Sequence, residues 1–251
     1  MKRKTSIVFG GSRGIGSVIS KILKKRGDKL YVVSRRGNNF SNNVNIDLLD
    51  EEDIRQKLKE LFNRKKINNL IFSHRYRGHD TAEDFQVTLH SVGLIIDLLK
   101  DKLSKNSSIV IINSIAIRTI IYDQPQRYHV IRGALEQLVK YNAASLGNKG
   151  IRVNCILVTK IIKPENKKYF LKKSNPDRKM MESITPLKRM GTALDVAHLV
   201  DFLTSDKSTF LTGLSIPIDG GTRLLSQETI TTLIEPALAT VKKYLSWKNK
   251  K

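Results

Sequence analysis

A glycine-rich segment close to the first residue has the composition and spacing that bind phosphate groups. It reads Gly-Gly-Ser-Arg-Gly-Ile-Gly over residues 10–16, between an apolar run and a stretch with apolar residues at helical spacing. Glycines let the backbone turn sharply and approach a pyrophosphate, and the helix that follows offers N–H donors and the positive end of its dipole. The segment predicts a dinucleotide site, and a plain glycine turn is the alternative. Its predicted cofactor-binding residues are Gly10, Ser12, Arg13, Gly14, Ile15 and Gly16.

The end of the second predicted strand bears on which dinucleotide binds. An NAD site usually has an acidic residue there, which accepts hydrogen bonds from the adenosine ribose. This chain has Ser34-Arg35-Arg36 instead. We expect Arg35, together with Arg13, to pair with the 2′-phosphate of NADP(H), so NAD(H) is the less favoured cofactor. The alternative is that both arginines simply lie on the surface of a basic protein.

The elements that position these residues follow from the apolar pattern. Short apolar runs alternate with helical periodicity, which predicts βαβ units and a parallel sheet. We therefore expect an α/β fold with a Rossmann-type, doubly wound parallel sheet in a single domain over residues 1–222. Residues 164–181 are polar, and their pattern is irregular. The expected strands are residues 6–9, 30–33, 70–72, 108–112, 152–157 and 215–218, and the expected helices are 14–26, 50–61, 82–103, 128–146 and 194–203.

Composition narrows the functional classes. The 251 residues suit one α/β domain, and their net charge is +22. The cations are scattered, without a basic arm or interleaved aromatic residues, which favours a solvated surface over a nucleic-acid partner. No apolar run is long enough for a membrane span. The single Cys155 excludes an internal disulfide and suits a cytoplasmic protein, and the spacing of His79 and His90 predicts no metal site.

Residues 223–251 are expected to form a C-terminal helical extension. Apolar residues recur there at helical spacing, and lysines follow them. This pattern is typical of an amphipathic helix that packs on its own domain or on a sister subunit. Binding to a membrane surface is the alternative. The apolar positions are Ile230, Ile234, Leu238, Val241 and Leu245.

Several further segments follow the glycine motif in a fixed order. They are Ile151-Arg152-Val153-Asn154, residues 186–192, Asp195-Val196-Ala197, residues 202–206, Thr212-Gly213 and Asp219-Gly220-Gly221. Together with the Gly-x-x-x-Gly-x-Gly spacing, they resemble the short-chain dehydrogenase/reductase family over nearly the whole chain. The resemblance implies an oxidoreductase that acts on a small-molecule carbonyl or secondary alcohol. It also implies a homo-oligomer, a dimer or a tetramer, formed through the two long helices and the last strand.

The same resemblance implies roles for individual residues. In the family, a serine, a tyrosine and a lysine four residues after the tyrosine carry the reaction, and an asparagine on the preceding long helix assists them. Tyr128 matches the general acid/base, and Ser114 matches the residue that polarises the substrate oxygen. Arg132 stands where the family has lysine, and it also matches the group that binds the nicotinamide ribose. Thr88 matches the asparagine, and Asp47-Leu48 matches the segment that contacts adenine.

Other positions depart from the family pattern. Arginine is a permanent cation that still favours the phenolate form of Tyr128, but it is longer, planar and unable to relay a proton. His74-Arg75 replaces small residues beside the cofactor. The segment His74-Arg75-Tyr76-Arg77-Gly78 resembles a subgroup linked to surface-polysaccharide gene clusters, which implies a sugar or nucleotide-linked sugar as substrate. A basic loop without a ligand is the alternative there.

Three functions follow from these observations. The favoured one is an active NADP(H)-dependent oxidoreductase that interconverts a carbonyl and a secondary alcohol. The second is a cofactor-binding relative with weak or no catalysis, which acts as a partner or regulatory subunit. The third is a basic surface-binding module that uses the charge and the C-terminal extension.

Overall fold

A parallel β-sheet forms the centre of the structure. The computed structural model describes residues 3–35, 40, 42–63, 65–172 and 175–234. The strand order is β3-β2-β1-β4-β5-β6-β7, and each neighbouring pair is parallel. The strands are β1 Thr5–Phe9, β2 Lys29–Ser34, β3 Asn43–Asn45, β4 Ile67–Phe72, β5 Leu103–Ser114, β6 Arg152–Val158 and β7 Ser215–Ile218.

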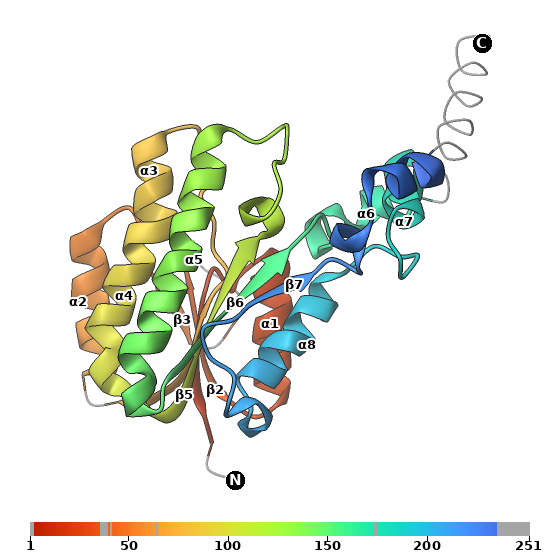
Figure 1. Cartoon of the computed structure of the whole chain (residues 1–251). Coiled ribbons are helices and arrows are strands. Elements are labelled where there is room, and N and C mark those ends of the chain that lie inside the picture. The colour runs from red at the N-terminus through yellow and green to blue at the C-terminus, as the bar shows by residue number, and fades with distance from the viewer. Residues whose placement is uncertain (1–2, 36–39, 41, 64, 173–174, 235–251) are drawn as a thin grey trace.

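Helices cover both faces of this sheet (Figure 1). On one face lie α2 (Glu51–Phe62), α4 (Ser91–Leu99) and α5 (Gln126–Leu146), and on the other lie α1 (Gly14–Lys25) and α8 (Ala193–Leu203). Helix α3 (Thr81–Phe85) joins α4 through a π-helical turn, Gln86–His90. Two short helices, α6 (Lys167–Phe170) and α7 (Pro176–Ser183), project beyond the sheet. The predicted single-domain Rossmann-type fold is confirmed.

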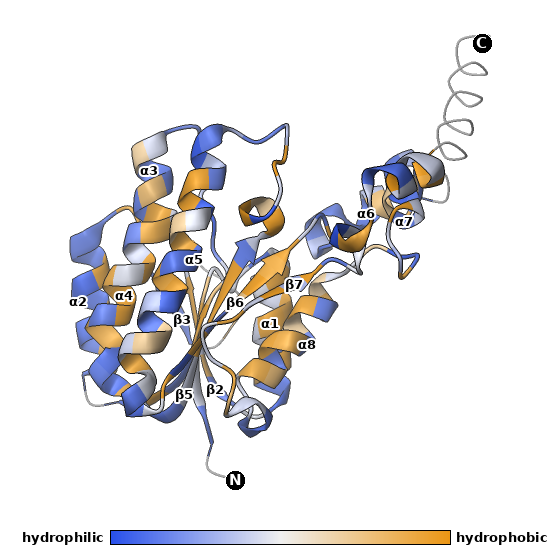
Figure 2. Ribbon diagram, viewed as in Figure 1, coloured by the Kyte–Doolittle hydropathy of each residue, from blue (hydrophilic) through white to orange (hydrophobic). Residues whose placement is uncertain are grey.

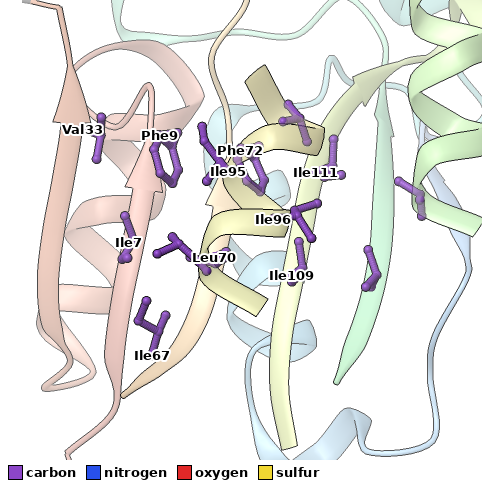
Figure 3. Packing of buried hydrophobic residues seen from close by; sticks show 14 of the residues in the cluster. Ile7, Phe9, Val33, Ile67, Leu70, Phe72, Ile95, Ile96, Ile109 and Ile111 are labelled. Carbon is purple, nitrogen blue, oxygen red and sulfur yellow. The ribbon is translucent and has the colours of Figure 1, made fainter. Parts of the chain in front are cut away.

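The strands at the centre are almost continuously apolar because helices cover both of their faces. Figure 2 shows that the hydrophobic sides of the helices face the sheet. The Phe9 and Phe72 rings stack with centroids 5.0 Å apart, and Ile7, Leu70 and Ile95 pack close by in the same cluster (Figure 3). Burying one such side chain contributes about 1.5–3 kcal/mol. This packing fixes the carboxyl ends of β1 and β4, where the functional loops begin.

The segment Ile151-Arg152-Val153-Asn154, one of those that resemble the family, has a structural role. Asn154 on β6 donates to the Leu211 carbonyl at 2.8 Å and accepts from the Leu214 amide at 3.1 Å. Arg152 is buried and donates to the Leu203 carbonyl at 2.9 Å. These bonds satisfy backbone groups of the segments that lead into β7. The motif therefore ties the edge of the sheet to α8.

The structure corrects three expectations. The helix predicted over 82–103 contains a π turn and ends earlier, because Leu103 pairs with Ile67 as the start of β5. The segment 164–181 is not irregular: it contains α6 and most of α7, whose first turn is capped by Asn175. Strand β3 was not predicted, since three residues carry too little pattern.

The expected C-terminal extension is described only in part. Residues 227–234 are helical, and residues 235–251 lie outside the described residues, so most of the predicted amphipathic pattern does too. Within the described part of the chain, no helix has the length and hydropathy needed to cross a bilayer.

Candidate cofactor and catalytic site

The glycine loop connects β1 to α1 at the carboxyl edge of the sheet. Gly10 has φ +75°, and a Cβ atom there would lie 2.6 Å from the backbone of His74. A Cβ on Gly16 would lie 2.2 Å from the Gly10 carbonyl oxygen. Side chains at these two positions would open the turn. The turn delivers the chain into α1 at Gly14, where no described side chain caps the helix, so its first N–H groups can bind an anion.

A cavity of about 880 Å³ opens beside this loop. It lies next to the point where the strand order reverses between β1 and β4, which is where ligands bind in open α/β sheets. Its size falls within the range of small-molecule sites, roughly 300–1,000 Å³. The predicted cofactor-binding residues that line it are Gly10, Ser12, Arg13, Arg35, Asp47 and Leu48, while Gly14, Ile15 and Gly16 form the first turn of the adjoining α1.

One end of the cavity has the features of an adenosine site. Arg35 follows β2 and is exposed, and Asp47-Leu48 follows β3. The Asp47 carboxylate accepts from the Leu49 amide at 3.1 Å, which fixes the turn. Lys21 and Lys24 from α1 also line the cavity and add to the positive charge of Arg13 and Arg35. Both lysines were missed because they are typical of the exposed face of a helix.

Three of the predicted catalytic residues lie on two adjoining elements, α5 and β5. Tyr128 and Arg132 are one turn apart on α5, with the guanidinium carbon 5.1 Å from the centre of the tyrosine ring. Ser114 ends β5, and its hydroxyl accepts from the Ala116 amide at 3.2 Å, so its hydrogen can be donated to a substrate oxygen. The Asn113 side chain donates to the Arg132 carbonyl at 3.0 Å and holds β5 against α5.

Comparison with known proteins gives the family. A family model described as enoyl-(acyl carrier protein) reductase matches residues 71–223, which is more than half of the chain. The chain belongs to the short-chain dehydrogenase/reductase family. A tropinone reductase homologue from Arabidopsis thaliana is 29% identical over 250 residues, covering 88% of this chain and 80% of that protein.

Solved structures have the same fold. A short-chain dehydrogenase family protein from Francisella tularensis has a TM-score of 0.76 at 25% identity, covering 89% of this chain and 100% of that chain. The Pseudomonas aeruginosa RhlG/NADP active-site complex has a TM-score of 0.74 at 22% identity. The match covers 87% of this chain and 96% of that chain. The present chain is an oxidoreductase of this family.

The cation at the position of the family's lysine is buried. Arg132 is 5% exposed, and burial lowers the pKa of its guanidinium, while Tyr128 and Asp84 act in the opposite direction. Because the ordinary pKa of arginine is so high, the group stays charged. Asp84, which is buried on α3, accepts from the Thr88 hydroxyl at 2.8 Å and lies 3.6 Å from the Arg127 Nε.

Asp84 therefore supplies negative charge to this part of the site. It was missed because an acid in the first turn of a helix usually serves only that helix. Thr88 is placed in the π turn with its hydroxyl directed at Asp84. The residues that line the 880 Å³ cavity do not include Ser114, Thr88, Tyr128 or Arg132. They do include Val87, which precedes Thr88 in the chain.

His74, which the sequence places beside the cofactor, lines the cavity. Its Nε2 lies 2.9 Å from the Val87 carbonyl, which can only accept, so Nε2 carries the proton and Nδ1 is a bare acceptor. Burial lowers the pKa of His74 to about 4, and the charge of Arg132 acts in the same direction. The imidazole is therefore neutral at physiological pH.

The Nδ1 atom is also a test of whether a cofactor fits. It is buried and has no partner among the described residues, although His74 lines the cavity. Leaving such an acceptor unpaired costs about 1–3 kcal/mol, so a hydroxyl group or a water molecule is expected to donate to it. This acceptor, the glycine cradle and the cations fit a hydroxyl-rich, phosphate-bearing dinucleotide.

Proposed function

We propose that the protein is an NADP(H)-dependent oxidoreductase that interconverts a carbonyl and a secondary alcohol. The observation that carries the proposal is the Tyr128–Arg132 pair on α5, with the guanidinium carbon 5.1 Å from the centre of the tyrosine ring. A hydrogen bond from the Asn113 side chain to the Arg132 carbonyl joins this part of α5 to the end of β5 that bears Ser114. The cation-lined cavity beside the glycine loop supports the cofactor assignment.

The side chains divide the chemistry among them. A bound nicotinamide supplies or accepts the hydride. In the reductive direction the Tyr128 hydroxyl gives a proton to the substrate oxygen, and in the oxidative direction the phenolate takes it back. The Ser114 hydroxyl donates a hydrogen bond to the same oxygen and stabilises its negative charge. Arg132 stabilises the phenolate and offers its N–H groups to the nicotinamide ribose.

For the substrate we propose a sugar or a nucleotide-linked sugar. Arg75, Tyr76 and Arg77 line the cavity beyond the glycine loop, and both arginines are exposed. Cations and an aromatic hydroxyl at the mouth of the site suit a polyhydroxylated ligand that carries negative charge. Steady-state turnover over a panel of ketosugars and simple ketones tests this class.

The first prediction concerns the choice of cofactor. NADPH is expected to bind about ten- to a hundredfold more tightly than NADH, because an arginine–phosphate contact contributes about 1.5–3 kcal/mol. Arg35→Ala is expected to lower NADPH affinity by about tenfold or more while leaving NADH affinity nearly unchanged. Isothermal titration calorimetry measures all four dissociation constants.

A matched control is Lys105→Ala, which removes one exposed cation at the opposite edge of the sheet. This variant is expected to have the same dissociation constants for NADPH and NADH as the wild type. Equal affinities of the wild type for NADPH and NADH, or parallel losses of both in Arg35→Ala, would contradict the assignment of the 2′-phosphate to this arginine.

A cofactor-binding protein with little catalysis is the competing proposal. It is favoured by the arginine at position 132 and by His74, whose backbone lies close against Gly10. NADPH binding without turnover on any carbonyl of the panel would select this second function. Absence of NADPH binding would reject both.

We also propose that the protein forms a dimer or a tetramer through α4, α5 and the β7 edge. Large apolar side chains are exposed there, including Val130 and Tyr141 on α5 and Leu214 before β7. Light scattering at micromolar concentration is expected to report the oligomer. Tyr141→Glu is expected to shift it toward monomer, while Tyr122→Glu in the loop before α5 leaves it intact. A wild-type monomer would rule the assembly out.

A further inference from the structure

A second group of cations lies at the mouth of the cavity, away from the adenosine end. Arg75 and Arg77 follow β4 and line the cavity, and Lys163 follows β6. Burial lowers the pKa of Arg77 and of Lys163, and the positive charge of Arg75 lowers both further. The three side chains, which we call the mouth cations, therefore lie close enough to repel one another. Such an arrangement favours the binding of an anion between them.

In this structure the anion is Glu165. Its Oε1 lies 3.8 Å from the Arg77 Nη2, and its charge also favours the protonated form of Lys163. The same Oε1 lies 2.8 Å from the position of a Cβ on Gly14, against the first turn of α1. The Lys163 amide donates to the Asn166 side chain at 2.6 Å, which fixes the turn that carries Glu165.

Glu165 lies where a cofactor phosphate is expected. The first turn of α1 is the expected site of the pyrophosphate, so carboxylate and pyrophosphate repel each other there. A cofactor that enters the glycine loop displaces Glu165 from Gly14. Among the described residues, Arg77 is the only mouth cation within 4 Å of the Glu165 carboxylate, so a phosphate that replaces this carboxylate can pair with Arg77 while Arg75 and Lys163 lose their nearby anion.

The charge of a dinucleotide does not account for these cations. Lys21, Lys24 and Arg35 also line the cavity, and Arg13 lies in the glycine loop beside the N–H groups of α1. These groups suffice for a 2′-phosphate and a pyrophosphate.

We propose that Arg75, Arg77 and Lys163 form a second anion site, which binds a phosphate group of the substrate after the cofactor has displaced Glu165. This inference rests on the proposed function and deepens it. It assigns a phosphate-bearing substrate, and it requires the cofactor to bind first. Glu165 keeps the site filled in the cofactor-free protein.

The test uses inorganic pyrophosphate as the probe and calorimetry as the readout. Wild-type protein saturated with NADPH, whose own phosphate sites are then filled, is expected to bind one pyrophosphate per chain. The double variant Arg75→Ala/Arg77→Ala is expected to bind it about a hundredfold more weakly, since each charge-assisted contact accounts for about tenfold or more. The NADPH dissociation constant of this variant is expected to stay within about threefold of the wild type, since other groups hold the cofactor.

Two control variants complete the design. Lys59→Ala/Lys105→Ala removes the same charge from exposed sites at the opposite edge of the sheet and is expected to leave pyrophosphate binding unchanged. Glu165→Gln is expected to tighten NADPH binding by about tenfold, because it removes the competing carboxylate. Glu60→Gln, an exposed acid on α2, is expected to have no effect.

The outcomes separate this inference from the function on which it rests. A wild type that binds NADPH but no pyrophosphate overturns the second anion site alone. Equal losses in the two double variants overturn it as well, since the probe then adsorbs to the basic surface. So does a loss of NADPH affinity in Arg75→Ala/Arg77→Ala that matches its loss of pyrophosphate affinity. A wild type that binds no NADPH overturns both proposals.

Discussion

Tyr128→Phe is expected to lower turnover by about 10²- to 10⁴-fold, down to the background rate. The phenol is the group assigned to proton transfer, and the Arg132 guanidinium carbon lies 5.1 Å from the centre of its ring. Phenylalanine keeps the ring and its contact with Arg132 while removing the proton. The measurement is kcat with NADPH and the best carbonyl of the panel, together with the NADPH dissociation constant, which is expected to change little.

Tyr141→Phe is the matched control for this substitution. Tyr141 lies on the same helix, is largely exposed and is far along α5 from Tyr128, so its hydroxyl has no role in the proposed chemistry. Its loss is expected to leave kcat unchanged. A wild-type rate that survives Tyr128→Phe would refute the mechanistic assignment, because the acid would then have to be another group.

Arg132→Ala is expected to lower kcat by roughly a hundredfold. A hundredfold loss corresponds to about 2.7 kcal/mol, which one charge–charge interaction in a partly buried site can supply. The buried Asp84 also loses a nearby cation, so a lower melting temperature is expected. The link between Asn113 and the Arg132 carbonyl involves the backbone and should persist in the variant.

Arg132→Lys distinguishes a working site from one that has lost catalysis. If the pocket is otherwise intact, lysine supplies the same charge and regains the ability to relay a proton, so activity is expected to be retained or raised. Lys140→Ala, which removes an exposed cation further along α5, serves as the control and is expected to leave kcat unchanged. Activity that is equal in the wild type and in Arg132→Ala would show that this cation does not act on Tyr128.

Much of the fold was predictable because it depends on local pattern. The central strands are continuous apolar runs, and α1, α5 and α8 have clear periodicity and end signals, so their predicted limits agree with the structure to within two residues. The π turn at Gln86–His90 and the polar helices α6 and α7 had no comparable signal. A π turn adds one residue to a turn without changing the residue types, and short polar helices bury too little to leave an apolar stripe.

The sequence by itself determined the family, the parallel architecture, the glycine loop after the first strand, and the placing of Tyr128 and Arg132 on one helix face. Each of these depends on residue types at short spacings. Only the tertiary structure decided that Asp84 offsets the charge near Arg132 and that Glu165 lies against the glycine loop. It also decided that the buried Nδ1 of His74 has no hydrogen-bond donor among the described residues. These contacts join segments far apart along the chain, and their geometry depends on how loops pack over the carboxyl edge of the sheet, which no local spacing encodes.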